Sequence, residues 1–300
     1  MTSEIVPPHP RNPGDAWGFA DAGSTYWGRF GAAGLLVLDP HRGALLQHRA
    51  LWSHFGGTWG LPGGARHEGE NAVDGAIREA SEEAAVDADA VRSRFSHTLD
   101  LGVWSYVTVV ADVVAPFEPH VADPESLEIR WVPLDEISAL PLHPAFERMW
   151  PTLQRDLACR PVLVVDMANV VGSRPDGWWN DRPGAAERLG GQLVRFSGRG
   201  VAAAALDLPQ SHWWPDVVAV LEGQANKAAL DATGRLRVIR ADTDGDSRIV
   251  DEVSRLVAGP EASVVTVITS DRELRARVEA LGAQTRGAGW LLDQLTPLVE

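Results

Sequence analysis

The sequence predicts an α/β protein of two domains, and three observations predict it. The chain has 300 residues, too many for one ordinary core, and 45% of them are hydrophobic, as in a globular protein. Its first half mixes short strands with a few helices, whereas its second half alternates apolar strands with helices. The pattern changes at residues 156–161. We therefore expect a flexible arm at 1–27, one domain at 28–158 and another at 161–300.

The first domain is expected to contain four clear strands and two helices. Its strands are short runs rich in apolar and β-branched residues, at 34–39, 44–49, 105–114 and 128–133. The clearest helix covers 71–85, and a second covers 143–157.

The second domain has apolar runs that are spaced by helical segments. The runs lie at 161–166, 216–223, 236–242 and 263–270, and the helices at 183–199, 247–258 and 271–282. Buried strands that alternate with helices indicate a mostly parallel sheet covered on both faces, which is a three-layer α/β architecture.

Charge and composition exclude several classes of protein. A net charge of −14 does not attract nucleic acid over long range, so a phosphate-bearing substrate requires bound cations or a local Arg patch. The sequence has no uncharged apolar run of about 18 residues and no secretion signal at its start. The single cysteine, Cys159, excludes a disulfide framework. We expect a cytoplasmic protein without a membrane span; the oligomeric state stays open.

Three carboxylates share one face of the helix predicted at 71–85. Glu79, Glu82 and Glu83 lie at positions i, i+3 and i+4, where like charges repel. Hard cations such as Mg²⁺ would reverse this repulsion, because they prefer carboxylate oxygens as ligands. Arg78 can reach Glu82 or orient Glu79. The face therefore predicts a metal site.

The glycines Gly63 and Gly64 precede this helix and let the backbone approach a metal or a phosphate closely. Across this segment the sequence resembles the signature G-x5-E-x7-R-E-U-x-E-E-x-G-U of the Nudix hydrolases, over roughly residues 28–158. The matching residues are Gly64, Glu70, Arg78, Glu79, Glu82 and Glu83. Two positions depart from it. Ala80 is smaller than the usual aliphatic residue, and Ala85 replaces a glycine, so we expect a lost left-handed turn or a shifted helix end.

The resemblance implies an α/β/α fold with a mixed sheet and an enzyme that hydrolyses a pyrophosphate bond with Mg²⁺ or Mn²⁺. It implies metal ligands at Glu79, Glu82, Glu83 and the Gly63 carbonyl, with Glu79 also as a base, and with Arg78, Gly64 and Glu70 in support. Glu128 is a candidate additional ligand or base, and an exposed strand carboxylate is the equal alternative.

The other half of the substrate is less determined by the sequence. Phe55 and Trp150, together with the candidate substrate-binding residues Trp59, His143 and Phe146, can form a wall for a base. Core packing is the alternative for each, because aromatic residues are usually structural. Nucleoside triphosphates, dinucleotide cofactors and nucleotide sugars all stay open as substrates.

Acidic residues in the second half follow predicted strands. Asp166 ends one strand and Asn169 comes three residues later, Asp244 and Asp246 open a helix, and Asp271 opens another. The carboxyl ends of parallel strands are where open α/β sheets bind ligands. Helix capping is the alternative for the acids at helix starts.

The segments "DMAN", "GDSRIV" and "TSDRELR" resemble PIN-like nucleases of the NYN type, over about residues 161–290. This resemblance implies a pocket of Asp166, Asp246 and Asp271 that holds Mg²⁺ or Mn²⁺, supported by Asn169 and Asp244, with RNA as a partner. Ser247 stands where a further acid is often found, which puts nuclease activity in doubt. Several arginines can supply local positive charge, or can be solvated helix faces: Arg182, Arg188, Arg272, Arg275 and Arg277.

Three functions are compatible with these features. The first is a metal-dependent pyrophosphohydrolase acting on a nucleotide derivative and fused to a PIN-like domain. The second is an RNA 5′-end processing enzyme that trims the end and then cuts the chain. The third is a non-catalytic nucleotide sensor with a partner-binding C-terminal module. The complete set of acids on the helix argues against the third.

Overall fold

The computed structural model describes residues 13–14, 16–19, 25–175, 177–259 and 263–296. The chain divides into two compact units, Met1–Gln154 with Leu206–His212, and Arg155–Ala205 with Trp213–Glu300. The first unit is therefore discontinuous, which the sequence pattern does not reveal. Within it, the Ser211 N–H donates to the Ser96 carbonyl over 2.9 Å, and its Oγ accepts from the Thr98 N–H over 2.8 Å.

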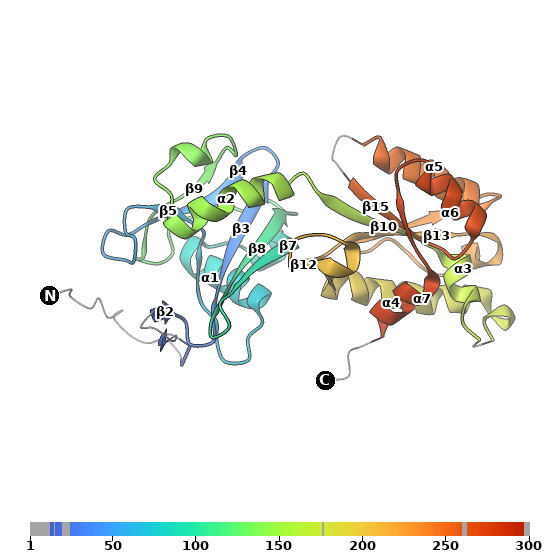
Figure 1. Ribbon diagram of the computed structural model, residues 1–300, viewed down its shortest axis with the longest axis horizontal. Helices are drawn as coiled ribbons and strands as arrows, with labels where there is room; N and C mark the ends of the chain where they lie inside the picture. Colours follow the sequence, from blue (N-terminus) through green and yellow to red (C-terminus); the bar gives the residue numbers. More distant parts are fainter. Residues whose placement is uncertain (1–12, 15, 20–24, 176, 260–262, 297–300) are drawn as a thin grey trace. The chain divides into compact units, whose positions relative to one another are not determined.

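The first unit contains a mixed sheet, as predicted (Figure 1). The strand order is β12 (His212–Trp213), β7 (Val91–Asp100), β8 (Ser105–Val113), β3 (Ala32–Asp39), β4 (Gly43–Arg49), β5 (Trp59–Gly60). β6 (Gly63–Ala65) also pairs with β3, and β9 (Ser126–Val132) with β4. β3 and β8 run parallel, whereas the β3–β4, β4–β9 and β7–β8 pairs are antiparallel. The strand β7 was not predicted, because its polar residues hide the apolar pattern.

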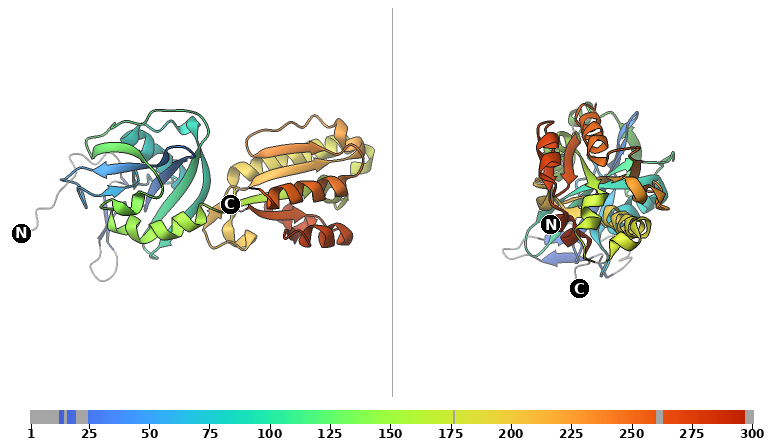
Figure 2. Two further views of the ribbon diagram at one scale, coloured as in Figure 1. Left: turned by 90° about the horizontal axis from the view of Figure 1, so that it is seen from above. Right: turned by 90° about the vertical axis from the view of Figure 1, so that its right-hand side faces the viewer.

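Two helices accompany this sheet, α1 (Ala72–Ala84) and α2 (Pro144–Asp156), close to their predicted bounds. α1 packs against β3, β6 and β8. Its small residues Ala76, Ala80 and Ala84 are fully buried in the core. The left view of Figure 2 shows α2 running along the sheet of this unit. The alanine stripe therefore fixes which face of α1 is left for the carboxylates.

Part of the predicted flexible arm forms regular structure. β1 (Trp17–Phe19) pairs with β2 (Thr25–Trp27) as an antiparallel hairpin. The Tyr26 ring stacks on Trp104 with centroids 4.8 Å apart. The indole N–H of Trp104 donates to the carbonyls of Trp27 and Gly28, both over 3.1 Å. Aromatic packing thus orders residues 25–27, which corrects the prediction there, while residues 1–12 lie outside the described chain.

The second unit contains the predicted parallel sheet. The order is β14 (Leu236–Arg240), β13 (Asp216–Leu221), β10 (Arg160–Asp166), β15 (Ser263–Ile268), β16 (Gln284–Arg286), with every pairing parallel. In Figure 1, α5 (Gly245–Val257) and α6 (Arg272–Glu279) cover one face of the sheet. The other face carries α3 (Met167–Gly172), α4 (Arg182–Arg199) and α7 (Ala288–Leu295). The short strand β11 covers Val201–Ala202. The strand β16 and the helices α3 and α7 were not predicted, and α6 ends three residues earlier than expected.

No helix among the described residues is long and apolar enough to cross a membrane.

The end of α1 keeps its left-handed turn although a glycine is missing there. Ala85 adopts φ 53° and ψ 36°, and its N–H donates to the Ser81 carbonyl over 3.1 Å. The next N–H, of Val86, donates to the Ala80 carbonyl over 3.2 Å. These bonds hold a conformation that is unfavourable for a residue with a Cβ. The expected loss of the turn was therefore wrong, because backbone hydrogen bonds outweigh the strain.

Ala85→Gly is expected to raise the free energy of unfolding by about 1 kcal/mol, because glycine adopts this backbone conformation without strain. Urea unfolding of the two proteins measures the difference. The matched control is Ala84→Gly, one residue earlier in the regular helix, which should lower stability instead. Equal stability of Ala85→Gly and the unaltered protein would show that the turn is not strained.

Candidate active site on the carboxylate helix

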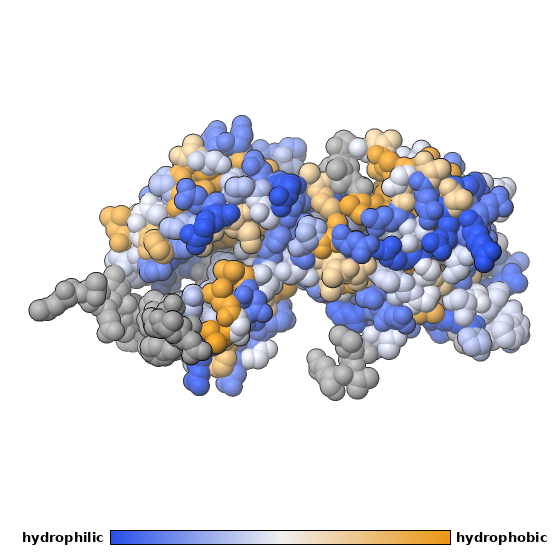
Figure 3. All heavy atoms as spheres, viewed as in Figure 1, coloured by the Kyte–Doolittle hydropathy of each residue, from blue (hydrophilic) through white to orange (hydrophobic). Residues whose placement is uncertain are grey.

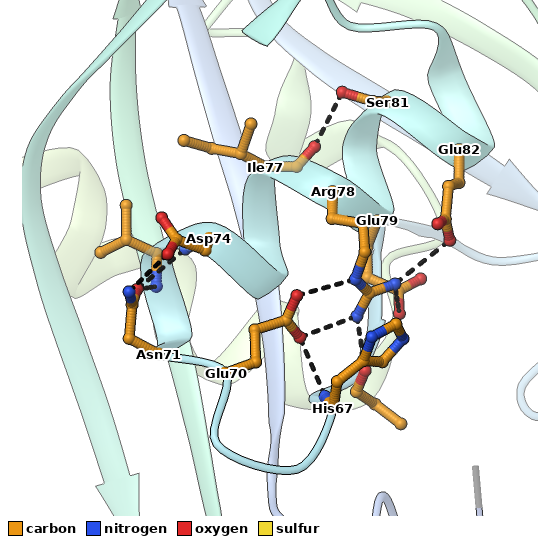
Figure 4. A network of polar contacts seen from close by, with 11 residues as sticks. His67, Glu70, Asn71, Asp74, Ile77, Arg78, Glu79, Ser81 and Glu82 are labelled. Carbon is orange, nitrogen blue, oxygen red and sulfur yellow. Dashed lines mark hydrogen bonds and ion pairs between the residues drawn. The ribbon is translucent and has the colours of Figure 1, made fainter. Parts of the chain in front are cut away.

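Arg78 lies at the centre of the carboxylates on α1 (Figure 4). Its Nε and Nη2 donate to the two oxygens of Glu70 over 2.8 and 3.0 Å, and Nη2 also donates to the Ala65 carbonyl over 2.9 Å. Its Nη1 donates to Glu79 over 2.9 Å and to Glu82 over 3.1 Å. Arg78 therefore both orients Glu79 and reaches Glu82. In the protein alone, the cation between the carboxylates is this guanidinium.

Glu70 belongs to the same network and closes the loop before the helix. Besides its two bonds from Arg78, it accepts the His67 N–H over 2.9 Å. The hydrogen bond from Arg78 lowers the pKa of Glu70 most strongly, so this carboxylate stays ionised. Glu70 thus acts on the predicted ligands Glu79 and Glu82 through Arg78.

Glu83 is the buried member of the set, with 7% of its surface exposed. The Gly63 N–H donates to its Oε2 over 2.8 Å. Burial, followed by the negative charge of Glu79, raises the pKa of Glu83 to about 8. Burial thus favours the protonated form of this carboxyl in the protein alone, and a nearby cation would favour the ionised form. The sequence predicted a role for the Gly63 carbonyl, whereas the contact that the structure places here is made by its N–H.

Gly64 lies close to the carboxylate of Glu79. A Cβ built on Gly64 would lie 2.7 Å from Oε2 of Glu79, closer than real Cβ contacts allow. The glycine therefore lets β6 lie directly against this carboxylate. The sequence predicted close approach at this glycine, but to a metal or a phosphate.

The donor chemistry of the helix fits a hard divalent cation. Carboxylate oxygens are the ligands that Mg²⁺ and Mn²⁺ prefer, and the negative charge of Glu79 adds to burial in raising the pKa of Glu83. Within the described chain, no group of three or more His, Cys, Asp or Glu side chains is arranged to hold a metal ion. One physical reason is that Arg78 engages oxygens of both Glu79 and Glu82.

Glu128 is not the acid that acts on this cluster most directly. It is exposed on β9, with an oxygen 3.7 Å from Nε of Arg130. The charge of Glu125, three residues earlier, is among the causes that raise the pKa of Glu83, after burial and Glu79. Sequence reasoning missed Glu125, because it lies before β9 in a loop with no recognisable spacing.

Most of the predicted aromatic wall is core. Trp59, Phe146 and Trp150 are 5%, 6% and 2% exposed. The Trp59 ring stacks on His48, with centroids 4.7 Å apart. This burial favours core packing, the alternative for Trp59 and Phe146, while their substrate-binding roles stay a prediction.

Carboxylates in the second unit gather at the carboxyl end of the parallel sheet. Asp166, at the end of β10, accepts the Thr269 hydroxyl over 2.9 Å and the Asn169 N–H over 3.0 Å. Burial, and then the charges of Glu222 and Asp271, raise its pKa. The pKa of Asp246 is raised by burial and then by Asp166. The predicted acids therefore lie within electrostatic range of one another.

Glu222 is a further acid of this group that sequence reasoning missed. It follows β13 directly and accepts the Gly245 N–H, at the start of α5, over 2.9 Å. Its charge also contributes to the raised pKa of Asp246. The sequence placed Glu222 inside a strand predicted at 216–223, whereas β13 ends at Leu221 and leaves this carboxylate at the strand end.

Helix capping accounts for several of the predicted residues. Asp166, Asp244 and Asp271 are the N-caps of α3, α5 and α6. For Asp166 the sequence offered no cap, because α3 was not predicted. The side chain of Asn169 accepts the Ser270 N–H over 2.9 Å and so joins α3 to the segment that follows β15. Asp246 is not a cap, so its position needs another explanation.

Four of the five arginines that could supply positive charge to this unit have neighbours close by. Arg188 lies 3.8 Å from Asp181, and Arg275 lies 3.8 Å from Glu279. The Arg182 guanidinium lies 5.4 Å from the Trp178 ring centre. The Nη2 of Arg277 is 3.5 Å from the Ser247 hydroxyl.

Comparisons with known proteins match the first unit. A family model described as "NUDIX domain" matches residues 28–155. Over 166 residues the chain is 45% identical to the "Putative 8-oxo-dGTP diphosphatase 3" of Mycobacterium tuberculosis, covering 52% of this chain and 76% of that protein. It is 41% identical over 157 residues to a "Nucleoside triphosphate pyrophosphatase/Nudix hydrolase fusion protein" of Bifidobacterium longum, covering 49% of this chain and 33% of that protein.

A crystal structure of the Nudix hydrolase RenU from M. smegmatis is 42% identical to this chain, with a TM-score of 0.45, covering 48% of this chain and 96% of that one. The residues that match the family model end before β10, the first strand of the second sheet. The resemblance of residues 161–290 to PIN-like nucleases stays a prediction.

Proposed function

Because the chain belongs to the Nudix hydrolase family and is a pyrophosphohydrolase of that type, we propose that it hydrolyses a purine nucleoside triphosphate to the monophosphate and pyrophosphate. An oxidised nucleotide, 8-oxo-dGTP, is the first candidate substrate, and the printed name of the M. tuberculosis relative supports it. The observation that carries the proposal is Glu83, a buried carboxyl with a raised pKa on the same helix face as Glu79 and Glu82. Such a group gains most from a cation that arrives with a polyphosphate.

We assign roles to the residues of this face. Glu79, Glu82, Glu83 and the Gly63 carbonyl would hold Mg²⁺ or Mn²⁺, which neutralises phosphate charge and lowers the pKa of water. Arg78, itself bound to Glu70, positions Glu79 and Glu82 through hydrogen bonds. The Gly63 N–H positions Glu83 in the same way. Glu79 is the candidate base. Glu125 replaces Glu128 as the additional carboxylate, since its charge reaches Glu83.

The test is turnover of purified full-length protein with Mg²⁺ or Mn²⁺ against 8-oxo-dGTP, dGTP, a dinucleotide cofactor, a nucleotide sugar and a 5′-triphosphorylated RNA. We expect the highest kcat/KM with 8-oxo-dGTP and release of pyrophosphate. Preference for the sugar or the dinucleotide would refute the substrate. Preference for the RNA end would favour the RNA-processing alternative, and binding without turnover would favour the sensor.

Two variants in the same experiment separate the two acids near β9. Glu125→Gln should lower kcat/KM about 10- to 100-fold, the range seen when a residue that supports a metal site is lost. Glu128→Gln, which removes an exposed carboxylate of the same type, should leave it within about two-fold. The reverse pattern would restore Glu128 as the additional ligand or base.

A specific observation favours a second candidate function in the C-terminal unit. Asp166, Glu222, Asp246 and Asp271 lie in mutual electrostatic range at the carboxyl end of a parallel sheet, where α/β folds bind ligands. We propose that they bind Mn²⁺ or Mg²⁺ as a PIN-like site for phosphodiester cleavage, with RNA as the partner. Helix capping explains three residues near this edge but not Asp246. After burial, every charge that raises the pKa of Asp246 comes from another carboxylate.

Mn²⁺ titration of the full chain by calorimetry tests this second site. Asp246→Asn should abolish one class of binding sites, because it removes charge without removing a helix cap. Asp181→Asn is the control, since it also removes one exposed carboxylate, at the N-cap of α4, and asparagine caps helices as well as aspartate does. Unchanged stoichiometry in Asp246→Asn would leave the unit as a binding module without this metal site.

A further inference from the structure

The loop between β4 and β5 exposes three large apolar side chains. Leu51, Trp52 and Phe55 are 78%, 41% and 46% exposed. Figure 3 shows hydrophobic atoms at the left edge of the molecule, where Figure 1 places this loop. Exposed apolar side chains that gather in one place on a surface often mark a binding site. The loop is therefore a candidate binding surface.

The backbone of the loop is fixed in an unusual shape that presents Phe55. This residue has φ 55°, a left-handed value that is rare for a bulky side chain. Its carbonyl accepts the Thr58 hydroxyl over 2.6 Å, and the Gly57 N–H donates to the Arg49 carbonyl over 3.0 Å. Strain that is retained by surrounding bonds is typical of functional sites. The bonds keep the loop from relaxing away from this shape.

Two imidazoles flank the Phe55 ring. The His54 and His143 rings meet it edge to face, with centroids 4.3 and 4.7 Å away. Burial, and then the charge of Arg49, lowers the pKa of His143 to about 4, and the same two causes lower the pKa of His54. The Nδ1 of His143 accepts the Ala145 N–H over 3.2 Å, as a neutral ring does. The rings thus form an aromatic surface that is uncharged at neutral pH.

Arg49 connects this surface with the carboxylate helix. Its Nε donates to the His54 carbonyl over 3.1 Å. Its charge also offsets part of the rise in the pKa of Glu83 that burial causes, so its guanidinium lies within electrostatic range of that carboxyl. A Cβ at Gly60 would lie 3.6 Å from Cβ of His143. Gly60 is three residues before Gly63, whose N–H binds Glu83, so their Cα atoms are at most roughly 11 Å apart.

We propose that Phe55, flanked by His54 and His143, stacks on the base of the nucleotide whose phosphates bind at the carboxylate helix. The inference rests on the proposed function, since it assigns the base end of that substrate. A flat, uncharged aromatic group suits this surface because purines stack on aromatic side chains, whereas a sugar or a bare phosphate chain has no aromatic ring. Phe55 is then a specificity residue and not a member of the metal site.

The test compares Phe55→Asn, Phe55→Trp and the unaltered full-length protein with 8-oxo-dGTP and with inorganic tripolyphosphate. Asparagine tolerates the left-handed backbone, so the loop should keep its shape. We expect Phe55→Asn to raise KM for the nucleotide by about 5- to 100-fold, the effect of losing one stacked base, with kcat nearly unchanged. Phe55→Trp should restore KM, and binding of tripolyphosphate should be the same in all three proteins.

Trp179→Ala is the matched control, because Trp179 is a 59% exposed aromatic residue of the other unit. It should leave KM unchanged. An unaltered KM in Phe55→Asn, or an equal loss of tripolyphosphate binding, would overturn the stacking role while hydrolysis itself stands. If the unaltered protein hydrolyses no nucleotide, the proposed function fails, and calorimetric binding of the nucleotide to the same variants then decides the stacking role by itself.

Discussion

Glu83→Gln is expected to reduce kcat/KM with Mg²⁺ by at least about 100-fold while the fold is retained. A lost partner of a metal ligand typically reduces activity 10- to 100-fold, and a direct ligand should matter more. Glutamine keeps the shape and can still accept the Gly63 N–H, but it cannot become the anion that a cation requires. Steady-state kinetics and circular dichroism of the variant measure the two effects. A rate close to that of the unaltered protein would refute the metal role of α1.

The same variant should change how stability depends on pH. The pKa of Glu83 is about 8 in the folded protein and near 4.5 when unfolded, so the folded state holds the proton between these values. The contribution of Glu83 to the free energy of unfolding is therefore greatest below pH 4.5. It falls as the pH rises to 8, by at most about 1.4 kcal/mol per pH unit. Metal-free Glu83→Gln should lack this fall. Glu82→Gln, at an exposed position, should keep it.

Arg78→Lys is expected to destabilise the protein by about 2–3 kcal/mol and to lower kcat/KM by about 10- to 100-fold. Lysine carries the charge but lacks the planar fork that binds both oxygens of Glu70 while donating to Glu79. The stability estimate lies below that for a fully buried pair, because the Arg78 side chain is 20% exposed. Urea unfolding and kinetics in the same buffer measure both quantities.

Arg42→Lys provides the control for this substitution. Arg42 is 31% exposed and binds Asp39 over 3.0 Å, away from α1. Arg42 also lies 3.5 Å from Glu118, and its guanidinium carbon lies 4.2 Å from the Trp131 ring centre. Partly exposed contacts of this kind contribute about 0–1 kcal/mol each, so stability should fall less than in Arg78→Lys and activity should change little. If the two lysine variants lose equal stability, the Arg78 network stabilises the protein no more than the contacts of Arg42 do. If Arg78→Lys loses stability but keeps full activity, the orientation of Glu79 does not matter for the reaction.

Local patterns were sufficient for much of the fold. The start of α1 is encoded by Asn71, whose side chain accepts the N–H groups of Val73 and Asp74 over 3.0 Å. The parallel sheet of the second unit followed from apolar runs, since strands buried on both faces need apolar residues throughout. The strand β7 did not follow, because its buried residues include the polar Arg94 and Ser96 on either side of Phe95, and only the sheet around them makes their burial possible.

The sequence by itself determined which side chains of α1 lie together, because residues 78–83 are neighbours on one helix and helical geometry places Arg78 beside Glu79 and Glu82. Only the tertiary structure decided which side chains from elsewhere join them. Glu125 acts on Glu83, and Glu222 on Asp166, across separations along the chain that carry no periodic signal. Burial is decided in the same way. Trp59 and Phe55 are both aromatic and four residues apart, but packing against β4 buries one ring and a left-handed backbone exposes the other.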